Sequence, residues 1–320
     1  QPLIPAFKAY LDGYLTANTA DARLTYFDKE NKKGIDLGVH ALANDTCVNF
    51  NLYPDVPTIG YRQFALNDDN YIRTYLDRPF EADVKLKSMS DSCYIQIGAF
   101  ENEYHKQTIN AIIDNLNLHE LLSVIPVPIP DMSGNLDFNA NYIEQTEGFL
   151  VNGDMEALRF TYNGMSVGDI ASRFNYLPIG DKAHSIDADL KFNGTDVASV
   201  KGEYDTEGKG AINADLTLNS IPLSMVSPFI PDQIVALTGN MNGGINITGP
   251  TDAFIVNGAL IPQDVHVISN QYSVDLALAN DPIRFTNSRV DFDQFEFRGS
   301  GENPLTLNGY VDFSNLDEVL

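Results

Sequence analysis

Basic residues are scarce in this sequence. Lysine and arginine together number 20, against 44 aspartates and glutamates, which gives a formal net charge of −24. Binding to nucleic-acid phosphates needs clustered Lys and Arg side chains. The charge balance therefore excludes nucleic-acid binding, and we interpret the acidity as a solvated outer face.

Cysteine is rare as well. Cys47 and Cys93 are the only two, and neither belongs to a Cys-x-x-Cys motif. Two buried thiols and one disulfide both fit this pair, and the low count agrees with an envelope protein.

Motifs of catalysis are also missing. The five histidines show no zinc-site spacing, and no nucleophile elbow, Walker loop or dinucleotide fingerprint precedes a helix. Asp187 and Asp189, like Asp291 and Asp293, resemble a glycosidase carboxylate pair, but alternation explains them as a solvated face. We interpret residues 67–70 (NDDN) as a solvated turn rather than a calcium loop. We expect no enzyme, no cofactor and no metal site.

Long hydrophobic runs are absent. No run reaches the ~18 apolar residues that span a bilayer, and the most apolar stretch, residues 121–129 (LLSVIPVPI), contains two prolines. The sequence starts and stops within a strand-and-turn pattern, so we expect it to be part of a longer protein. With 320 residues, of which 43% are hydrophobic, it can bury one large core or two modest ones.

An internal repeat organises what is present. Residues 129–153 match residues 230–258 through an Ile-Pro-Asp, a Gly-Asn and a Val-Asn-Gly sequence. Gly134 and Gly239 give an offset of 105 residues, whereas Ile129 and Ile230 give 101, which predicts a four-residue insertion. So long a period excludes small helical solenoids and indicates a unit of β-sheet.

Apolar and polar residues alternate almost continuously from Asp131 onward. A two-residue period puts one sheet face in an apolar environment and the other in water. The parity changes at Asp293 and Gln294, which predicts a β-bulge. The apolar positions are the candidate groove residues: Leu136, Phe138, Tyr142, Ile186, Leu190, Phe192, Ile212, Leu216, Leu218, Ile245, Ile247, Val274, Leu276, Leu278, Phe292, Phe295 and Phe297.

The first 114 residues are less regular. Large apolar residues at helix-like spacing predict a short amphipathic helix within residues 4–19, followed by alternating strands up to residue 99. Proline-flanked helical turns are expected at residues 119–124 and 222–227. We predict residues 1–114 as a β-rich part of the same elongated sheet or a separate small domain, and residues 115–320 as the regular β-groove.

Three arrangements would cover the apolar face: a second sheet, a bilayer around a barrel, or a curled sheet that leaves a groove for an apolar ligand. The proline-flanked inserts and the lack of aromatic girdles disfavour the barrel. A sandwich and a groove bury the same face, so periodicity does not separate them.

Several segments resemble the TamB family, the translocation and assembly module inner-membrane subunit, which is related to the AsmA-like envelope and bridge-like lipid-transfer proteins. The similar segments are residues 221–229 (IPLSMVSPF), 237–250 (LTGNMNGGINITGP), 255–258 (IVNG), 282–285 (PIRF), 295–299 (FEFRG) and 304–309 (PLTLNG). The resemblance covers residues 115–320 well and the first 110 residues poorly.

The resemblance implies an all-β, mainly antiparallel and repetitive fold: an elongated, curved sheet that forms a half-pipe with an apolar interior and few short helices. It implies a non-enzymatic protein of the periplasm, anchored to the inner membrane by a segment absent here. Phospholipid acyl chains and an Omp85-type outer-membrane barrel, contacted through a region outside this chain, are the implied partners. The implied function is phospholipid conduction between inner and outer membranes, assistance to outer-membrane protein assembly, or both. A cell-surface β-sandwich or solenoid module that binds protein or glycan stays open as the alternative.

Overall fold

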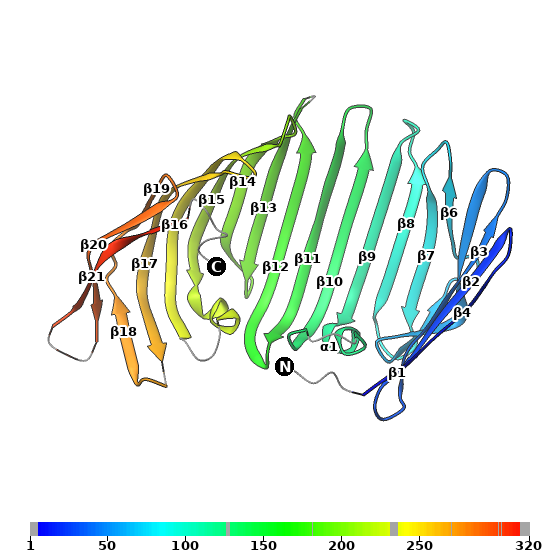
Figure 1. Cartoon of the computed structure of the whole chain (residues 1–320), viewed down its shortest axis with the longest axis horizontal. Coiled ribbons are helices and arrows are strands. Elements are labelled where there is room, and N and C mark those ends of the chain that lie inside the picture. Colours follow the sequence, from blue (N-terminus) through cyan, green and yellow to red (C-terminus); the bar gives the residue numbers. More distant parts are fainter. Residues whose placement is uncertain are drawn as a thin grey trace. The chain divides into compact units, whose positions relative to one another are not determined.

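The computed structural model describes residues 6–125, 129–180, 182–230, 236–269, 271–299, 301 and 303–313. Within these ranges the chain is almost entirely antiparallel β-structure, with 21 strands assigned to one sheet and only three short helical segments (Figure 1). The predicted all-β, antiparallel fold class is confirmed. None of the described helices has the length and apolar character to cross a membrane. The chain divides into two compact units, residues 1–164 and 165–320.

The first unit is a sheet in which strands that are neighbours in the chain are neighbours in space. The short strands β5 and β6 lie one after the other and both pair with β4 and β7. Its elements are β1 (Lys8–Leu15), β2 (Thr19–Phe27), β3 (Lys33–Ala43), β4 (Cys47–Ile59), β5 (Arg62–Leu66), β6 (Tyr71–Tyr75), β7 (Glu81–Ser88), β8 (Tyr94–Glu101), β9 (Gln107–Asn117), α1 (Leu118–Leu122), β10 (Met132–Glu144) and β11 (Phe149–Tyr162).

The helix predicted near the N-terminus is wrong, because residues 8–15 form strand β1. This strand pairs with β2 in an unbroken register from Lys8 opposite Phe27 to Leu15 opposite Ala20. The large side chains of β1 satisfy a two-residue period as well as a helical one. Pairing with a neighbouring strand decides between the two, since tertiary context overrides local periodicity.

The second unit has the same neighbour-to-neighbour topology. Strands β18 and β19 both pair with β17 and with β20. Its elements are β12 (Met165–Pro178), β13 (Ala183–Phe192), β14 (Thr195–Asp205), β15 (Ala211–Pro222), η1 (Leu223–Met225), η2 (Ser227–Phe229), β16 (Ala236–Pro250), β17 (Ile255–Ser269), β18 (Val274–Leu278), β19 (Ile283–Thr286), β20 (Arg289–Arg298) and β21 (Leu305–Asp312).

The predicted bulge and helical turns are confirmed. The register of β20 against β21 shifts between Phe292 and Phe295, and Gln294 has a φ of 52°. The helix α1 begins after Asn117, whose side chain accepts a hydrogen bond from the backbone N–H of Glu120. In the second unit, Pro228 stands at the start of η2, where its missing N–H costs no hydrogen bond.

The sequence repeat is also a repeat of backbone structure. Asn115 and Ser220, 105 residues apart, have φ values of 51° and 55°. The N–H of Asn115 donates to Asp137, and the N–H of Ser220 donates to Asn242, again at an offset of 105. In both copies these contacts hold the strand that precedes the helical turn against the strand that follows it.

The offset of 105 holds on both sides of the helical turn. The helix α1 begins at Leu118 and η1 at Leu223, and the positive-φ glycines of the next strands are Gly134 and Gly239. From the start of the helical turn to these glycines the copies therefore align without a net insertion. The four-residue insertion predicted after the Ile-Pro-Asp sequence falls on residues 231–235, which lie outside the described residues. Part of the second Ile-Pro-Asp sequence lies outside the described residues.

The division between units differs from the boundary expected from the sequence. The expected boundary after residue 114 falls inside β9, which continues to Asn117 and pairs with both β8 and β10. The compact units divide after Gly164 instead. Strands β9 to β11, which carry the first copy of the repeat, thus belong to the first unit.

Candidate functional site

Antiparallel register brings the predicted apolar residues of the second unit onto one face of its sheet. Ala188 lies opposite Val200, Val200 opposite Leu216, Leu216 opposite Ile245, and Ile245 opposite Gly258. Directly opposite residues share a face of the sheet. We call this side the second apolar face, and it continues through β17 to the strands that end the unit.

The second apolar face holds all fourteen candidates that belong to this unit. On its last strands Leu278 lies opposite Phe297, and the rings of Phe292, Phe295 and Phe297 contact one another in sequence with centroids 5.7 and 5.4 Å apart. The members are Ile186, Leu190, Phe192, Ile212, Leu216, Leu218, Ile245, Ile247, Val274, Leu276, Leu278, Phe292, Phe295 and Phe297.

Most of these side chains are half-buried. Phe295 is buried, Val274 is exposed, and the other twelve are intermediate. A sheet packed against a second sheet buries such positions nearly completely. Within the described part of the second unit, buried apolar side chains do not gather into a cluster, so this face stays partly accessible.

The opposite face of the second unit is polar. Asn213, Asp215 and Thr217 alternate with the apolar residues of β15, and all three are exposed. Asp187, considered in the sequence as one member of a carboxylate pair, lies on this face with its Oδ2 3.7 Å from the Nζ of Lys201. The two faces of β13 to β15 therefore differ as the two-residue period predicts, whereas β17 places Ile255 and Ile261 on the polar face.

The three remaining candidates, Leu136, Phe138 and Tyr142, lie in the first unit on the corresponding side of its sheet. Tyr142 is opposite Ile109, and Phe138 is opposite Ile113. We call this side the first apolar face. In the first unit the structure thus brings the candidates together with apolar residues of β9 that the sequence analysis had not included.

Part of the first apolar face is closed by a core cluster. It consists of the buried residues Phe64, Leu66, Val84, Leu86, Cys93 and Leu116. Leu52 of β4 and Leu136 of β10 both pack against it, although several strands separate them in the sheet. The first unit is therefore curved enough for distant strands to share one core, with Phe64 only 1% exposed.

The helix α1 closes this core at the ends of the strands. A Cβ atom at Gly60 would lie 3.1 Å from the backbone of Glu120 and Leu121, and one at Gly34 would lie 2.7 Å from a methyl group of Val124. Glycine at these positions allows the α1 segment to approach the β4–β5 turn and β3 closely. Val124, just after α1, is 4% exposed.

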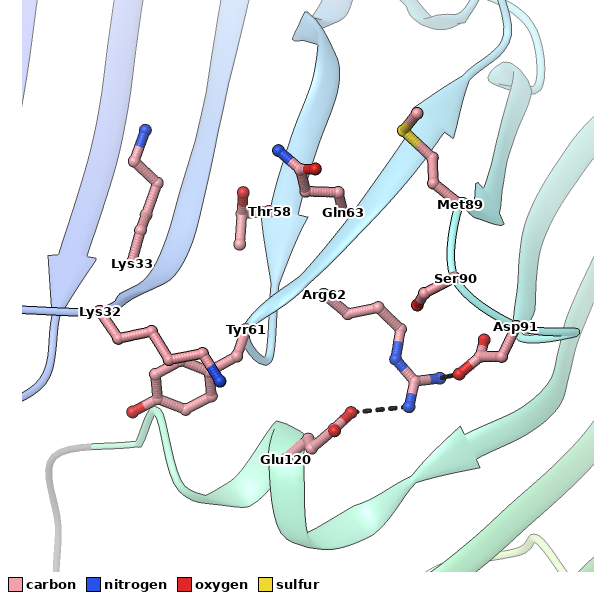
Figure 2. Close-up of a pocket in the computed structure, with 10 residues that line it drawn as sticks. All are labelled: Lys32, Lys33, Thr58, Tyr61, Arg62, Gln63, Met89, Ser90, Asp91 and Glu120. Carbon is pink, nitrogen blue, oxygen red and sulfur yellow. Dashed lines mark hydrogen bonds and ion pairs between the residues drawn. The ribbon is translucent and has the colours of Figure 1, made fainter.

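A polar pocket of about 820 Å³ opens beside α1 (Figure 2). Arg62 is its central side chain and is only 11% exposed. Its Nη2 donates a hydrogen bond of 2.6 Å to Oε2 of Glu120, and its Nη1 forms an ion pair of 2.8 Å with Oδ2 of Asp91, at an angle too poor for a directed hydrogen bond. The lining residues are Lys32, Lys33, Thr58, Tyr61, Arg62, Gln63, Met89, Ser90, Asp91 and Glu120.

The electrostatics of this pocket favour a structural role. Burial acts to lower the pKa of Arg62, but the charges of Glu120 and Asp91 outweigh it and raise that pKa. Burial also acts to raise the pKa of Asp91. A hydrogen bond with the backbone N–H of Cys93, a hydrogen bond with the side chain of Ser88 and the charge of Arg62 together outweigh burial and lower that pKa. Because two carboxylates neutralise the guanidinium, we interpret the Arg62 group as a clamp that fastens α1 to β5 and to the β7–β8 turn.

The other polar groups near the pocket lead to the same conclusion. Burial raises the pKa of Tyr61 to about 12 and raises that of the Cys93 thiol, so both stay protonated near neutral pH. Cys93 and Cys47 are both free thiols, so the disulfide left open by the sequence is not formed; Cys93 is buried and Cys47 is half-buried. Cys93, with its raised pKa and buried position, lacks the features of a reactive nucleophile.

The Asn-Asp-Asp-Asn segment at residues 67–70 serves as a turn. Oδ1 of Asn67 accepts a hydrogen bond of 2.9 Å from the N–H of Lys85, and Oδ1 of Asn70 accepts one of 2.7 Å from the N–H of Leu52. Among the described residues, no group of three or more His, Cys, Asp and Glu side chains is placed to hold a metal ion.

Sequence reasoning missed the Arg62 clamp. Arg62 and Glu120 are 58 residues apart, and neither stands in a recognisable motif. Only the curvature of the first unit brings the β4–β5 turn next to α1, and residue periodicity does not encode it.

Comparison with known proteins found no matching family model, no matching curated protein and no matching solved structure. The function is therefore argued from the geometry of the two apolar faces.

Proposed function

We propose that this chain is a non-enzymatic lipid-binding protein whose apolar sheet faces take up phospholipid acyl chains while the opposite faces stay in water. The observation that carries the proposal is the half-buried second apolar face, which extends over the strands from β12 to β21. Contiguous apolar surface on a soluble protein marks an interaction site when it exceeds a few hundred Å². An elongated apolar ligand matches a surface of this kind.

The energetics of such binding require no specific polar group. Each methylene that leaves water contributes about 0.8 kcal/mol, so a 16-carbon chain gains on the order of 10 kcal/mol. Equivalent apolar rows on successive strands offer an acyl chain many sites of similar affinity. We expect this arrangement to favour sliding along the face over trapping at one place.

The cellular part of the proposal rests on the resemblance to the TamB family alone. It places the protein in the periplasm, anchored to the inner membrane by a segment outside this chain. There it would conduct phospholipids between the inner and outer membranes, assist outer-membrane protein assembly, or do both. Its partner would be an Omp85-type barrel, contacted through a region outside this chain.

Lipid extraction and mass spectrometry on the gently purified chain test the proposal. Leu216→Asp in β15 and Ile247→Asp in β16 each place a carboxylate on the second apolar face. Thr217→Asp places one on the exposed polar face of β15. We expect phospholipid to copurify with the wild type and with Thr217→Asp, and to be lost from the first two variants.

Circular dichroism and urea denaturation show whether the variants remain folded. If the second apolar face is open, the new carboxylate stays in contact with water and both apolar-face variants fold. If lipid is absent from the wild type, and both variants unfold cooperatively at much lower urea concentrations, the face is a closed core and the proposal is wrong.

A further inference from the structure

The strands that carry the second apolar face end differently on its two sides. The turns between β12 and β13, between β14 and β15 and between β16 and β17 lie at the same end, because antiparallel neighbours reverse direction. We call this side the hairpin end. The segment η1–η2, which connects β15 to β16, lies at the opposite end (Figure 1).

Side chains of opposite charge alternate along the hairpin end. Lys182 of the β12–β13 turn forms an ion pair with Glu207 of the β14–β15 turn. Lys209 of the β14–β15 turn forms one of 2.6 Å with Asp252 of the β16–β17 turn. All four side chains are more than half exposed. Ion pairs so accessible to water contribute little to stability, so these groups can exchange partners with a ligand at small cost.

Aromatic side chains with polar atoms lie between these charges and the apolar side chains. His184 is opposite Tyr204, and Tyr204 is opposite Ile212, so all three belong to the second apolar face. The ring of Tyr176 stacks on that of His184, with centroids 4.5 Å apart. A Cβ atom at Gly210 would collide with the hydroxyl of Tyr204, so this hydroxyl reaches the β14–β15 turn. Tyrosine is enriched where the apolar interior of a membrane meets its headgroups.

At the opposite end, the η1–η2 segment presents apolar side chains. Val226 is 37% and Phe229 is 48% exposed. Between the two ends, the apolar positions of β15 from Ile212 to Leu218 extend over about 20 Å, at a rise of roughly 3.3 Å per residue. A phospholipid tail spans half of the hydrocarbon core of a bilayer, about 15 Å. A tail that lies along a strand therefore fits between the aromatic side chains and η1–η2.

We propose that the hairpin end binds the headgroup of a zwitterionic phospholipid whose tail lies along a strand toward η1–η2. This inference rests on the proposed lipid binding and adds the orientation of the lipid and the class of its headgroup. The phosphate accepts hydrogen bonds from a lysine, while the ammonium group donates to the neighbouring carboxylate. The apolar, aromatic and charged zones thus follow the lipid from its tail to its headgroup.

Acidic phospholipids fit the hairpin end less well. Their headgroups bring no ammonium group to Glu207 and Asp252, and the exposed Asp205 at the end of β14 adds a further carboxylate. The formal net charge of −24 repels an anionic lipid over a longer range. Because the pair of lysine and carboxylate recurs on successive hairpins, a zwitterionic lipid finds a similar headgroup site as it moves from strand to strand.

Competition between two lipids tests the proposal. The delipidated chain is incubated with vesicles of equal parts phosphatidylethanolamine and phosphatidylglycerol with identical acyl chains, separated from them, and its lipid is quantified by mass spectrometry. We expect phosphatidylethanolamine to exceed phosphatidylglycerol about three- to fivefold, as exposed charge interactions allow. Glu207→Lys/Asp252→Lys makes the hairpin end basic and should reverse the preference.

The matched control is Asp196→Lys/Asp215→Lys, which changes the net charge equally at exposed positions away from the hairpin end. It should keep the wild-type preference, and circular dichroism checks that both variants are folded. Equal uptake of the two lipids by the wild type, or an unchanged preference in Glu207→Lys/Asp252→Lys, would overturn the headgroup assignment but not lipid binding. Reversal in the control would assign selectivity to overall charge and overturn it too. A wild type that takes up neither lipid would overturn the proposed function itself.

Discussion

The two units carry the same strand, helical turn and strand pattern but differ in what covers it. In the first unit, α1 lies over a core cluster and is fastened by the ion pairs of Arg62. In the second, the hydroxyl of Ser227 in η2 donates to the C=O of Leu237 and accepts from its N–H. One pattern of alternation is thus compatible with a filled core and with an open face.

Side-chain size accounts for much of this difference. The first unit adds Phe64 and Leu66 from the short strand β5, which fill the space inside the curve of the sheet. On the second apolar face, large residues repeatedly meet glycine. Ile186 is opposite Gly202, and Leu218 is opposite Gly243. Small partners leave the large side chains without contacts on one flank, so the face stays accessible.

The largest effect that separates the two units is expected from truncating a buried ring. Phe64→Ala removes a side chain that is 1% exposed and should cost about 3–5 kcal/mol of unfolding free energy. Phe292→Ala on the half-buried second apolar face should cost about 1 kcal/mol. Urea denaturation of both variants measures the difference, and equal losses would show that both units have closed cores.

The next effect concerns the clamp. Arg62→Gln leaves Asp91 and Glu120 without their shared cation, and we expect a loss of about 1–2 kcal/mol, because the guanidinium is 11% exposed while its partners are more accessible to water. Arg298→Gln removes a guanidinium that is 72% exposed beside Glu296 and should change the unfolding free energy by only a few tenths of a kcal/mol. Similar losses in the two variants would contradict the clamp.

The pH dependence of stability should come mainly from the first unit. Hydrogen bonds from Arg23 lower the pKa of Asp36, against burial, and Lys33 lowers it further. A lowered folded-state pKa stabilises the fold above the unfolded value of about 3.9, and this contribution is lost as the pH falls through the lower, folded-state pKa.

Urea midpoints measured from neutral pH down through this acidic range check the effect. Asp36→Asn should be less stable than the wild type at neutral pH and should lose less stability on acidification. A matched control is Asp252→Asn, whose exposed partner is Lys209. Its urea midpoint should change with pH as that of the wild type does. A smaller change in this control would mean that exposed ion pairs set the acid sensitivity.

The alternation of residues predicted the fold class, the bulge in β20 and the side of the sheet on which each candidate residue lies. These features depend on the two-residue period and on local turn chemistry, which a sequence displays directly. The helical spacing within residues 4–19 misled because the residues that form β1 satisfy both periods, and pairing with β2 decides between them. The clamp and the core cluster depend on the curvature of the sheet, which brings distant residues together without a local signal.

The smallest expected effect tests whether the two copies of the repeat are equivalent on their polar faces. Asn141 accepts a hydrogen bond of 2.9 Å from Asn110 and donates one of 3.1 Å to Asn152, while Asn246, 105 residues later, donates one of 2.9 Å to Asp215. Asn141→Ala and Asn246→Ala should each cost about 0.5–1 kcal/mol, a typical net value for a hydrogen bond. Urea denaturation of the two variants measures this. A clearly larger loss for Asn141 would mean that the copies differ on both faces, and that the filled core of the first unit also strengthens its polar side.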